Sequence, residues 1–179
     1  MNKKRIIIIL LGLIVLGVIV FLIIKNCNKD IPSIVNKNSD LPVEYMMKKT
    51  SFKDDDKYEV INNYMSVDYH DNDVKFSFYG YPNDESDFYL GSLEIVSNMY
   101  NLLGVKVGDN LDKAISKIES YGFKRTDKGD NNYNVTMTKG DYTITVNGEI
   151  TVYSEDKEEE EVGAIKISVK SEYLGNKIY

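Results

Sequence analysis

The feature that most constrains this chain is an apolar stretch close to its N-terminus. Residues 6–24 read IIIILLGLIVLGVIVFLII, without a charged or strongly polar side chain. At about 1.5 Å of rise per residue, a helix over this stretch spans roughly 28 Å, close to the hydrocarbon thickness of a bilayer. A helix of a small soluble protein is rarely apolar all the way round. The sequence therefore predicts one transmembrane helix over residues 6–24.

A cleaved signal peptide and a lipid-modified cysteine are the two alternatives to a membrane span. A cleaved signal peptide has a shorter apolar region, of about 7–15 residues, and ends at a small-x-small cleavage site. Here the run ends in Ile-Ile-Lys-Asn, which offers no such site. A lipid-modified Cys27 requires small residues just before the cysteine, where Lys25 and Asn26 stand. A retained signal-anchor fits the residues better than either alternative.

The charges that flank the apolar stretch predict its orientation. Lys3, Lys4 and Arg5 precede it, and the segment that follows carries fewer basic residues close to the membrane. The positive-inside rule therefore predicts a single-pass protein of the cell membrane, with residues 1–5 in the cytoplasm and the chain after the helix outside it. Residues 25–43 are polar, contain two prolines and are interpreted as a linker. Residues 44–179 are then one extracytoplasmic domain.

The net charge and the cysteine count limit which partners and which stabilising bonds that domain can have. Leaving Lys3, Lys4 and Arg5 out of the 22 basic residues gives 19 against 28 acidic ones, a net charge of −9 from residue 6 onward. An acidic domain is a poor partner for nucleic acid or for anionic lipid surfaces. Cys27 is the only cysteine, so an intramolecular disulfide is impossible and stability must come from packing.

Alternating apolar residues predict strands over much of the domain. Met65, Val67 and Tyr69 alternate with polar residues, and a two-residue turn at 71–72 would pair Tyr69 with Val74. Residues 88–99 resume as a third strand. Residues 141–153 are interpreted as a second hairpin around Asn147-Gly148. A two-residue turn there would split the apolar residues between the two faces, so an odd-length loop or a bulge is expected. The acidic stretch 155–161 is interpreted as a solvated loop. No internal repeat is obvious in the sequence.

One helix is predicted over residues 110–121. Asp109 is a suitable N-cap, and Gly122 is placed for a left-handed C-cap. Four apolar residues at i, i+3, i+4 and i+7 form one stripe, namely Leu111, Ala114, Ile115 and Ile118. The expected fold is α+β, with a mainly antiparallel sheet of five to seven strands and this one principal helix.

The run LGVKVGDNLDKAISKIESYGF over residues 103–123 resembles a pattern that recurs in bacterial envelope modules. In that pattern, glycines and alternating hydrophobic residues open a short helix that ends in glycine, and antiparallel strands follow. It is found in β-lactamase-inhibitor-protein-like modules and in the small outer-membrane assembly lipoprotein family. The resemblance covers about residues 103–170. It implies a small α+β binding module without catalytic residues, and it transfers no partner or site.

The chain carries no strong catalytic or metal signature. His70 is the only histidine, and with Asp68 and Asp71 it forms the one cluster near residues 68–73 that could support acid–base chemistry. A polar surface turn is the simpler explanation of these residues. A zinc site needs further His or Cys ligands, and the spacing of a calcium loop is missing. We therefore expect no metal, no cofactor and no catalytic residue.

The most promising surface is FYGYP at residues 78–82. If Phe76 and Phe78 face the core, then Tyr79 and Tyr81 face the other way, where exposed tyrosines could anchor a protein or stack on a glycan. Burial of that face under a helix or loop is the competing interpretation. The sequence thus favours a membrane-tethered extracytoplasmic binding or envelope-assembly module that uses Tyr79 and Tyr81. The alternative is an enzyme acting on cell-wall material through the Asp/His cluster.

Overall fold

The computed structural model describes residues 31–80, 87–126, 134–154 and 157–170, together with Ile14, Leu16 and Gly17, which are helical. The rest of the predicted span over residues 6–24 lies outside the described residues. Within the described part of the chain, none of the helices has the length and apolar character needed to cross a bilayer.

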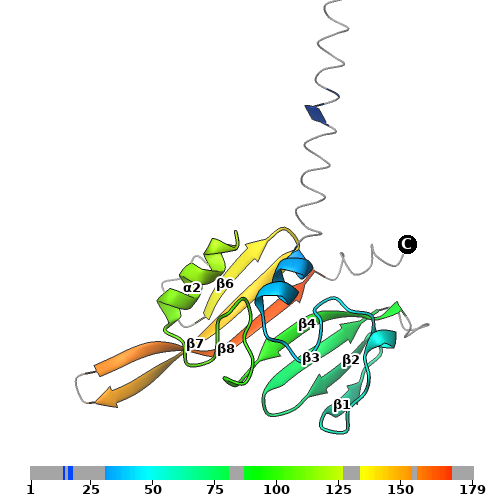
Figure 1. The fold of residues 1–179 in the computed structure, drawn as a ribbon, viewed down its shortest axis with the longest axis horizontal. Helices are drawn as coiled ribbons and strands as arrows, with labels where there is room; N and C mark the ends of the chain where they lie inside the picture. The colour runs from blue at the N-terminus through cyan, green and yellow to red at the C-terminus, as the bar shows by residue number, and fades with distance from the viewer. Residues whose placement is uncertain are drawn as a thin grey trace, which may run out of the picture.

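The chain folds around one antiparallel sheet whose strand order is β1-β2-β3-β4-β8-β7-β6-β5 (Figure 1). Its eight strands are β1 (Glu59–Asn62), β2 (Ser66–His70), β3 (Val74–Tyr79), β4 (Tyr89–Ile95), β5 (Lys124–Arg125), β6 (Asn134–Lys139), β7 (Tyr142–Ser154) and β8 (Lys157–Val169). The helical elements include α2 (Leu111–Ser120), a short 3-10 helix η1 (Lys49–Ser51) and a helix over 31–38. The predicted α+β class with a mainly antiparallel sheet is confirmed, with eight strands in place of five to seven.

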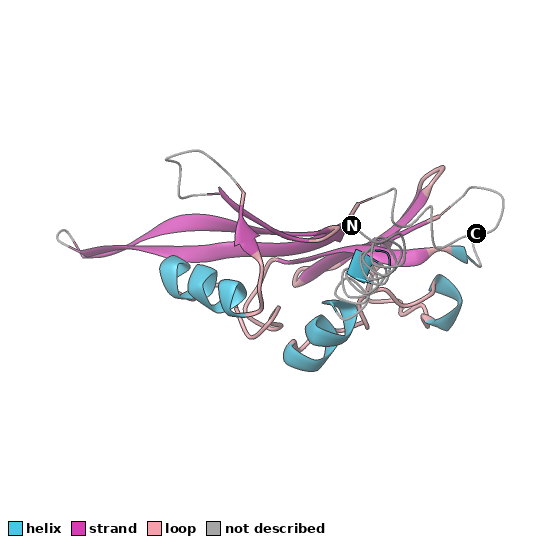
Figure 2. Cartoon of the chain, turned by 90° about the horizontal axis from the view of Figure 1, so that it is seen from above, coloured by secondary structure: helices cyan, strands magenta, loops and turns pink. Residues whose placement is uncertain are grey.

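The helices of the described residues lie on one face of the sheet and leave the other face uncovered (Figure 2). The core fills the space between the two layers. In β3, Val74, Phe76 and Phe78 are buried while their neighbours are exposed or half-buried. Because successive side chains of a strand point to opposite faces, this alternation defines a covered face and an open face.

The principal helix forms where the sequence predicted it. Leu111, Ala114 and Ile118 are buried on one side of α2. The N-cap is Asn110 rather than Asp109: the Asn110 side chain accepts a hydrogen bond from the backbone N–H of Lys113 at 3.2 Å. Asp109 instead accepts from the backbone N–H of Lys106 at 2.9 Å, within the turn that leads into the helix.

The segment interpreted as a linker, residues 25–43, belongs to the domain from residue 31 onward. Ile31 and Val35 lie one helical turn apart and are almost fully buried, at 1% and 0% exposure. The prediction failed because the composition is polar overall, whereas two apolar residues on one face suffice to dock a short helix. Residues 46–49 then extend the sheet locally, since the backbone N–H of Met46 donates to the carbonyl of Leu90 at 3.2 Å.

Both predicted hairpin registers differ from the structure. Asp71 forms the first corner of the β2–β3 turn, and its Oδ1 accepts from the backbone N–H groups of Asp73 and Val74, each at 2.8 Å. Tyr69 therefore pairs with Phe76 instead of Val74. This shift by two residues leaves the same side chains on the covered face.

The second predicted hairpin, over residues 141–153, is one continuous strand. β7 runs through Asn147 and Gly148, which lie at a β-bulge, and the preceding turn falls at Gly140, whose φ is 59°. Residues 157–161 of the predicted acidic loop are part of β8. Pairing between β7 and β8 over their full length stabilises an extended conformation at Asn-Gly, a pair that in isolation favours a turn.

The sheet contains an internal repeat that is not obvious in the sequence. Each half is a helix followed by four strands, and the two halves meet where β4 pairs with β8. The meeting strands carry matching segments, YLGSLEI at 89–95 and EVGAIKI at 161–167, and in both the strand pairing skips the glycine to form a bulge. Glu94 lies opposite Lys166 at the centre. A local twofold axis therefore passes through this pair and relates the two halves.

Candidate functional site

The open face of the sheet carries a row of short polar side chains across six strands. Strand pairing places these residues directly opposite one another, in the order Asp68, Ser77, Ser92, Ser168, Thr143 and Thr138. Neighbouring strands lie about 4.8 Å apart, so the row offers hydroxyl groups at regular intervals. Hydroxyls both donate and accept hydrogen bonds, which suits a polar ligand lying across the strands.

A second row on the same face, two residues further along each strand, carries charged side chains. It runs from Glu59 through His70, Lys75 and Glu94 to Lys166. The Nε2 atom of His70 lies 3.1 Å from a carboxylate oxygen of Glu59. Among the described residues, no salt bridge within 4.0 Å joins Lys75, Glu94 or Lys166 to an opposite charge. All three side chains line the hollow described below.

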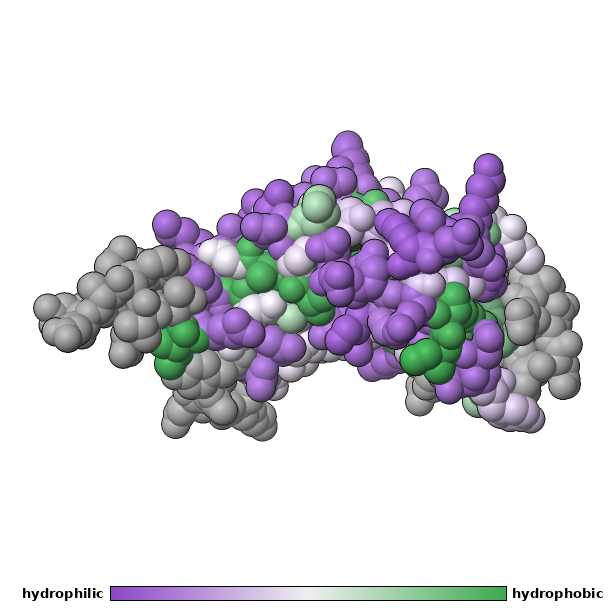
Figure 3. All heavy atoms as spheres, turned by 90° about the horizontal axis from the view of Figure 1, so that it is seen from below, coloured by the Kyte–Doolittle hydropathy of each residue, from purple (hydrophilic) through white to green (hydrophobic). Residues whose placement is uncertain are grey.

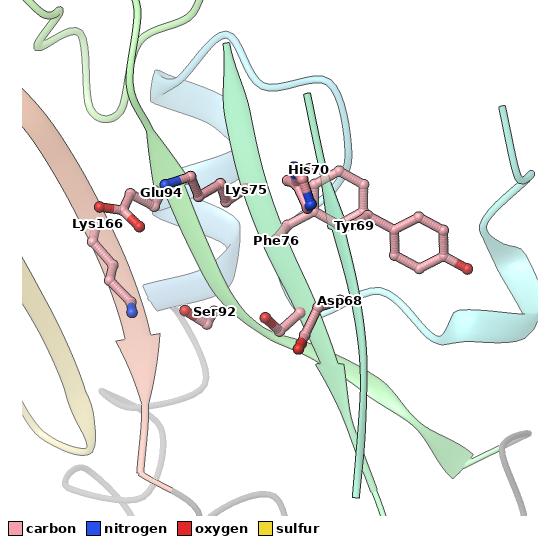
Figure 4. Close-up of a pocket in the computed structure, with 9 residues that line it drawn as sticks. Asp68, Tyr69, His70, Lys75, Phe76, Ser92, Glu94 and Lys166 are labelled. Atoms are coloured by element: carbon pink, nitrogen blue, oxygen red, sulfur yellow. The ribbon is translucent and has the colours of Figure 1, made fainter. Parts of the chain in front are cut away.

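The two rows meet at an open hollow of about 220 Å³ on β2, β3, β4 and β8 (Figure 4). Its polar lining consists of two acidic residues, two lysines, one histidine and two serines from these rows, and Tyr69 and Phe76 complete it. Ser92 is only 7% exposed and comes from the central strand β4. This hollow is the candidate binding site because it gathers the ionisable side chains of the open face in one place.

The structure only partly unites the predicted Asp/His cluster. Asp68 and His70 alternate with the covered-face Tyr69, so both lie on the open face and line the hollow. Asp68 accepts a hydrogen bond from the side-chain amide of Asn63 at 2.7 Å. Asp71 instead caps the β2–β3 turn. No group of three His, Cys, Asp or Glu side chains among the described residues is arranged to hold a metal ion.

Of the two predicted binding tyrosines, the structure describes Tyr79, which is the last residue of β3. Tyr79 is half-buried, packs against the core and pairs with Ser66 and Tyr89. Tyr81 lies outside the described residues. Their proposed role in binding stays a prediction.

Sequence reasoning missed the part of the hollow that comes from the centre of the sheet. Ser92, Glu94 and Lys166 lie in strands that are far apart in the sequence and pair only in the fold. The alternation in β3 does place Lys75 and Ser77 opposite the core residues, so that half of the hollow carried a sequence signal.

Exposed apolar side chains gather at the neighbouring sheet edge. Val60, Ile61, Tyr64 and Met65 lie on β1 or in the turn after it, and each is at least 46% exposed. The surface viewed from below is mostly hydrophilic, with hydrophobic atoms in separate patches (Figure 3). Since β1 pairs with β2, this apolar edge lies next to the hollow.

On the covered side, a polar cluster of Lys49, Asp54 and Tyr69 lies at the edge of the aromatic core. The Tyr69 hydroxyl donates to Asp54 Oδ1 at 2.8 Å, and Lys49 Nζ lies 3.2 Å from the same oxygen. The hydrogen bond from Tyr69 is the largest influence on the pKa of Asp54 and lowers it. Burial raises the pKa of the Tyr69 hydroxyl. Burial lowers the pKa of Lys49, but its hydrogen bonds to Tyr69 and Asp54 outweigh this and the net shift is upward. Tyr69 also borders the hollow, but its hydroxyl and this cluster lie on the covered side of the sheet.

Comparisons with known proteins identify no family. No family model matches the chain, and no curated protein matches it. A similar solved structure is an extracellular protein containing a SCP domain from Bacillus anthracis str. Ames. The two chains are 9% identical, with a TM-score of 0.32, and the match covers 68% of this chain and 42% of that one. A similarity of this size does not establish a common fold.

Proposed function

We propose that this protein is a membrane-tethered, extracytoplasmic binding module of the bacterial cell surface that binds an envelope component through the open face of its sheet. The observation that carries the proposal is the polar surface that the helices leave uncovered. This surface includes the hollow and the row of short polar side chains from Asp68 to Thr138, called the hydroxyl row below. An antiparallel sheet with one solvated face is stable without a covering layer, so this surface is available for a partner.

Two features of the sequence support the cellular setting. The apolar stretch 6–24 with its preceding basic residues favours a signal-anchor, and the acidic composition disfavours nucleic acid. The resemblance of residues 103–170 to envelope modules points in the same direction.

Protease treatment of intact cells tests the orientation: the domain should be digested, and full protection would contradict a location outside the membrane.

Binding is tested with insoluble cell-wall glycan and with detergent extracts of the envelope. The variant Thr143→Arg places a long charged side chain in the hydroxyl row, and Ser116→Arg places the same side chain on the exposed side of α2. Retention of the full-length protein should be lost for Thr143→Arg and kept for Ser116→Arg. Equal retention of the two variants would show that the open face is not the contact surface.

An enzyme acting on cell-wall material is the second candidate function. The observation that favours it is that Asp68 and His70 both line the hollow, with Glu59 beside the imidazole. A carboxylate can orient a histidine for acid–base catalysis. Release of soluble fragments from cell-wall glycan, abolished by His70→Ala, would replace the binding module with this function.

A further inference from the structure

We infer that the hollow binds a short zwitterionic peptide, with the peptide carboxylate near Lys166 and its ammonium group near Asp68. This inference rests on the proposed binding function and names the ligand class of the same site. The charges of the hollow carry it. Two lysines and two carboxylates leave the lining balanced apart from His70, which suits a ligand that carries both charges and has no net charge.

The charges are unevenly placed within the hollow. Glu94 lies in register between Lys75 and Lys166, so the part of the charged row that lines the hollow carries two positive charges and one negative charge. Asp68 lies in the neighbouring row beside Ser77 and Ser92. Figure 4 shows Lys166, Ser92 and Asp68 following one another across the hollow. A positive end and a negative end are therefore separated by serine hydroxyls that can hydrogen-bond peptide groups.

The separation of the two ends sets the size of the ligand. Asp68 on β2 and Lys166 on β8 are three strand steps apart across the sheet and two residues apart along it, or about 16 Å between backbones. The long Lys166 side chain shortens this gap. An extended peptide spans about 3.3–3.6 Å per residue, so a tripeptide covers about 10 Å and a single amino acid is too short to reach both ends.

The second half of the sheet serves as an internal control. Thr136 and Thr145 occupy the positions that the local twofold axis relates to His70 and Lys75, and Asn134 corresponds to Asp68. The repeated fold thus forms with neutral side chains at these places. The strand pairing therefore does not depend on charge at these three places, which is consistent with a role of Asp68 and Lys75 in binding.

Calorimetric titration of the full-length protein at low salt tests the inference with three probes: tri-alanine, N-acetyl-tri-alanine and tri-alanine amide. Tri-alanine should bind, and each blocked form should bind at least tenfold more weakly. Asp68→Asn should remove the discrimination against the acetylated peptide, because the group that recognises the ammonium is gone. Lys166→Met should remove the discrimination against the amide. Thr145→Ala, in the neutral half, should keep both.

The outcomes separate this inference from the proposed function. Equal binding of all three peptides, or a reversed pattern in the two variants, overturns the inference. If tri-alanine does not bind but envelope material is still retained through the open face, the ligand class is wrong and the binding module stands. If neither peptide nor envelope material binds, both proposals fall.

Discussion

Removing the ring of Phe76 tests the packing that supports the open face. Phe76 is 1% exposed, and its ring lies 5.0 Å from Tyr58, 5.3 Å from Tyr69, 5.5 Å from Phe52 and 6.1 Å from Phe78 between centroids. Replacing a buried Phe by Ala costs about 3–5 kcal/mol, and each aromatic pair adds about 0.5–1.5 kcal/mol beyond its area. With four ring partners, Phe76→Ala should fall at the upper end of that range, about 4–5 kcal/mol.

That loss is a large share of a typical folding free energy of about 5–15 kcal/mol. In a domain of this size, each kcal/mol moves Tm by about 2–4 °C, so Tm should fall by roughly 10–20 °C. Urea unfolding should show a lower midpoint at an unchanged m-value. The matched control is Ser77→Ala, one residue further on the open face, which should change stability by less than about 0.5 kcal/mol. A loss below about 1 kcal/mol for Phe76→Ala, or an equal loss for the control, would refute the assignment of the two faces.

Three further predictions concern a pH response, a turn and the predicted binding tyrosines. Because the folded pKa of Asp54 is lowered, its contribution to stability is fully present above the unfolded pKa of about 3.9 and is lost as the pH falls through the folded pKa. Asp54→Asn should therefore flatten the acid side of the plot of stability against pH. Urea titrations between about pH 2 and 5 measure this slope, and an unchanged slope would count against the prediction. Asp71→Ala removes two hydrogen bonds of 2.8 Å from the β2–β3 turn and should cost about 1–2 kcal/mol in chemical denaturation, where no loss would contradict the turn geometry. Replacing Tyr79 and Tyr81 together by Ser should weaken envelope binding strongly with little change in Tm, whereas a large fall in Tm would mean that the half-buried Tyr79 serves the core.

Local patterns in the sequence determine several elements of this fold. The stripe of Leu111, Ala114 and Ile118 specifies an amphipathic helix wherever the chain places it, because four residues complete about one turn. The alternation of Val74, Phe76 and Phe78 likewise assigns the faces of β3 without knowledge of its neighbours. One half of the candidate site, Lys75 and Ser77, follows from that alternation.

Tertiary pairing decides what those local patterns leave open. The Asn147-Gly148 pair favours a turn by itself, yet its partners on β8 hold it extended, because backbone hydrogen bonds along two long strands outweigh the preference of two residues. The hollow is completed by Glu94 and Lys166, which meet only because β4 pairs with β8. Such contacts depend on register between distant segments, and a polar side chain on a solvated face carries no burial signal to fix that register. The sequence by itself determined the helix, the class of sheet and the faces of its strands, and the tertiary structure decided which charges share the open face.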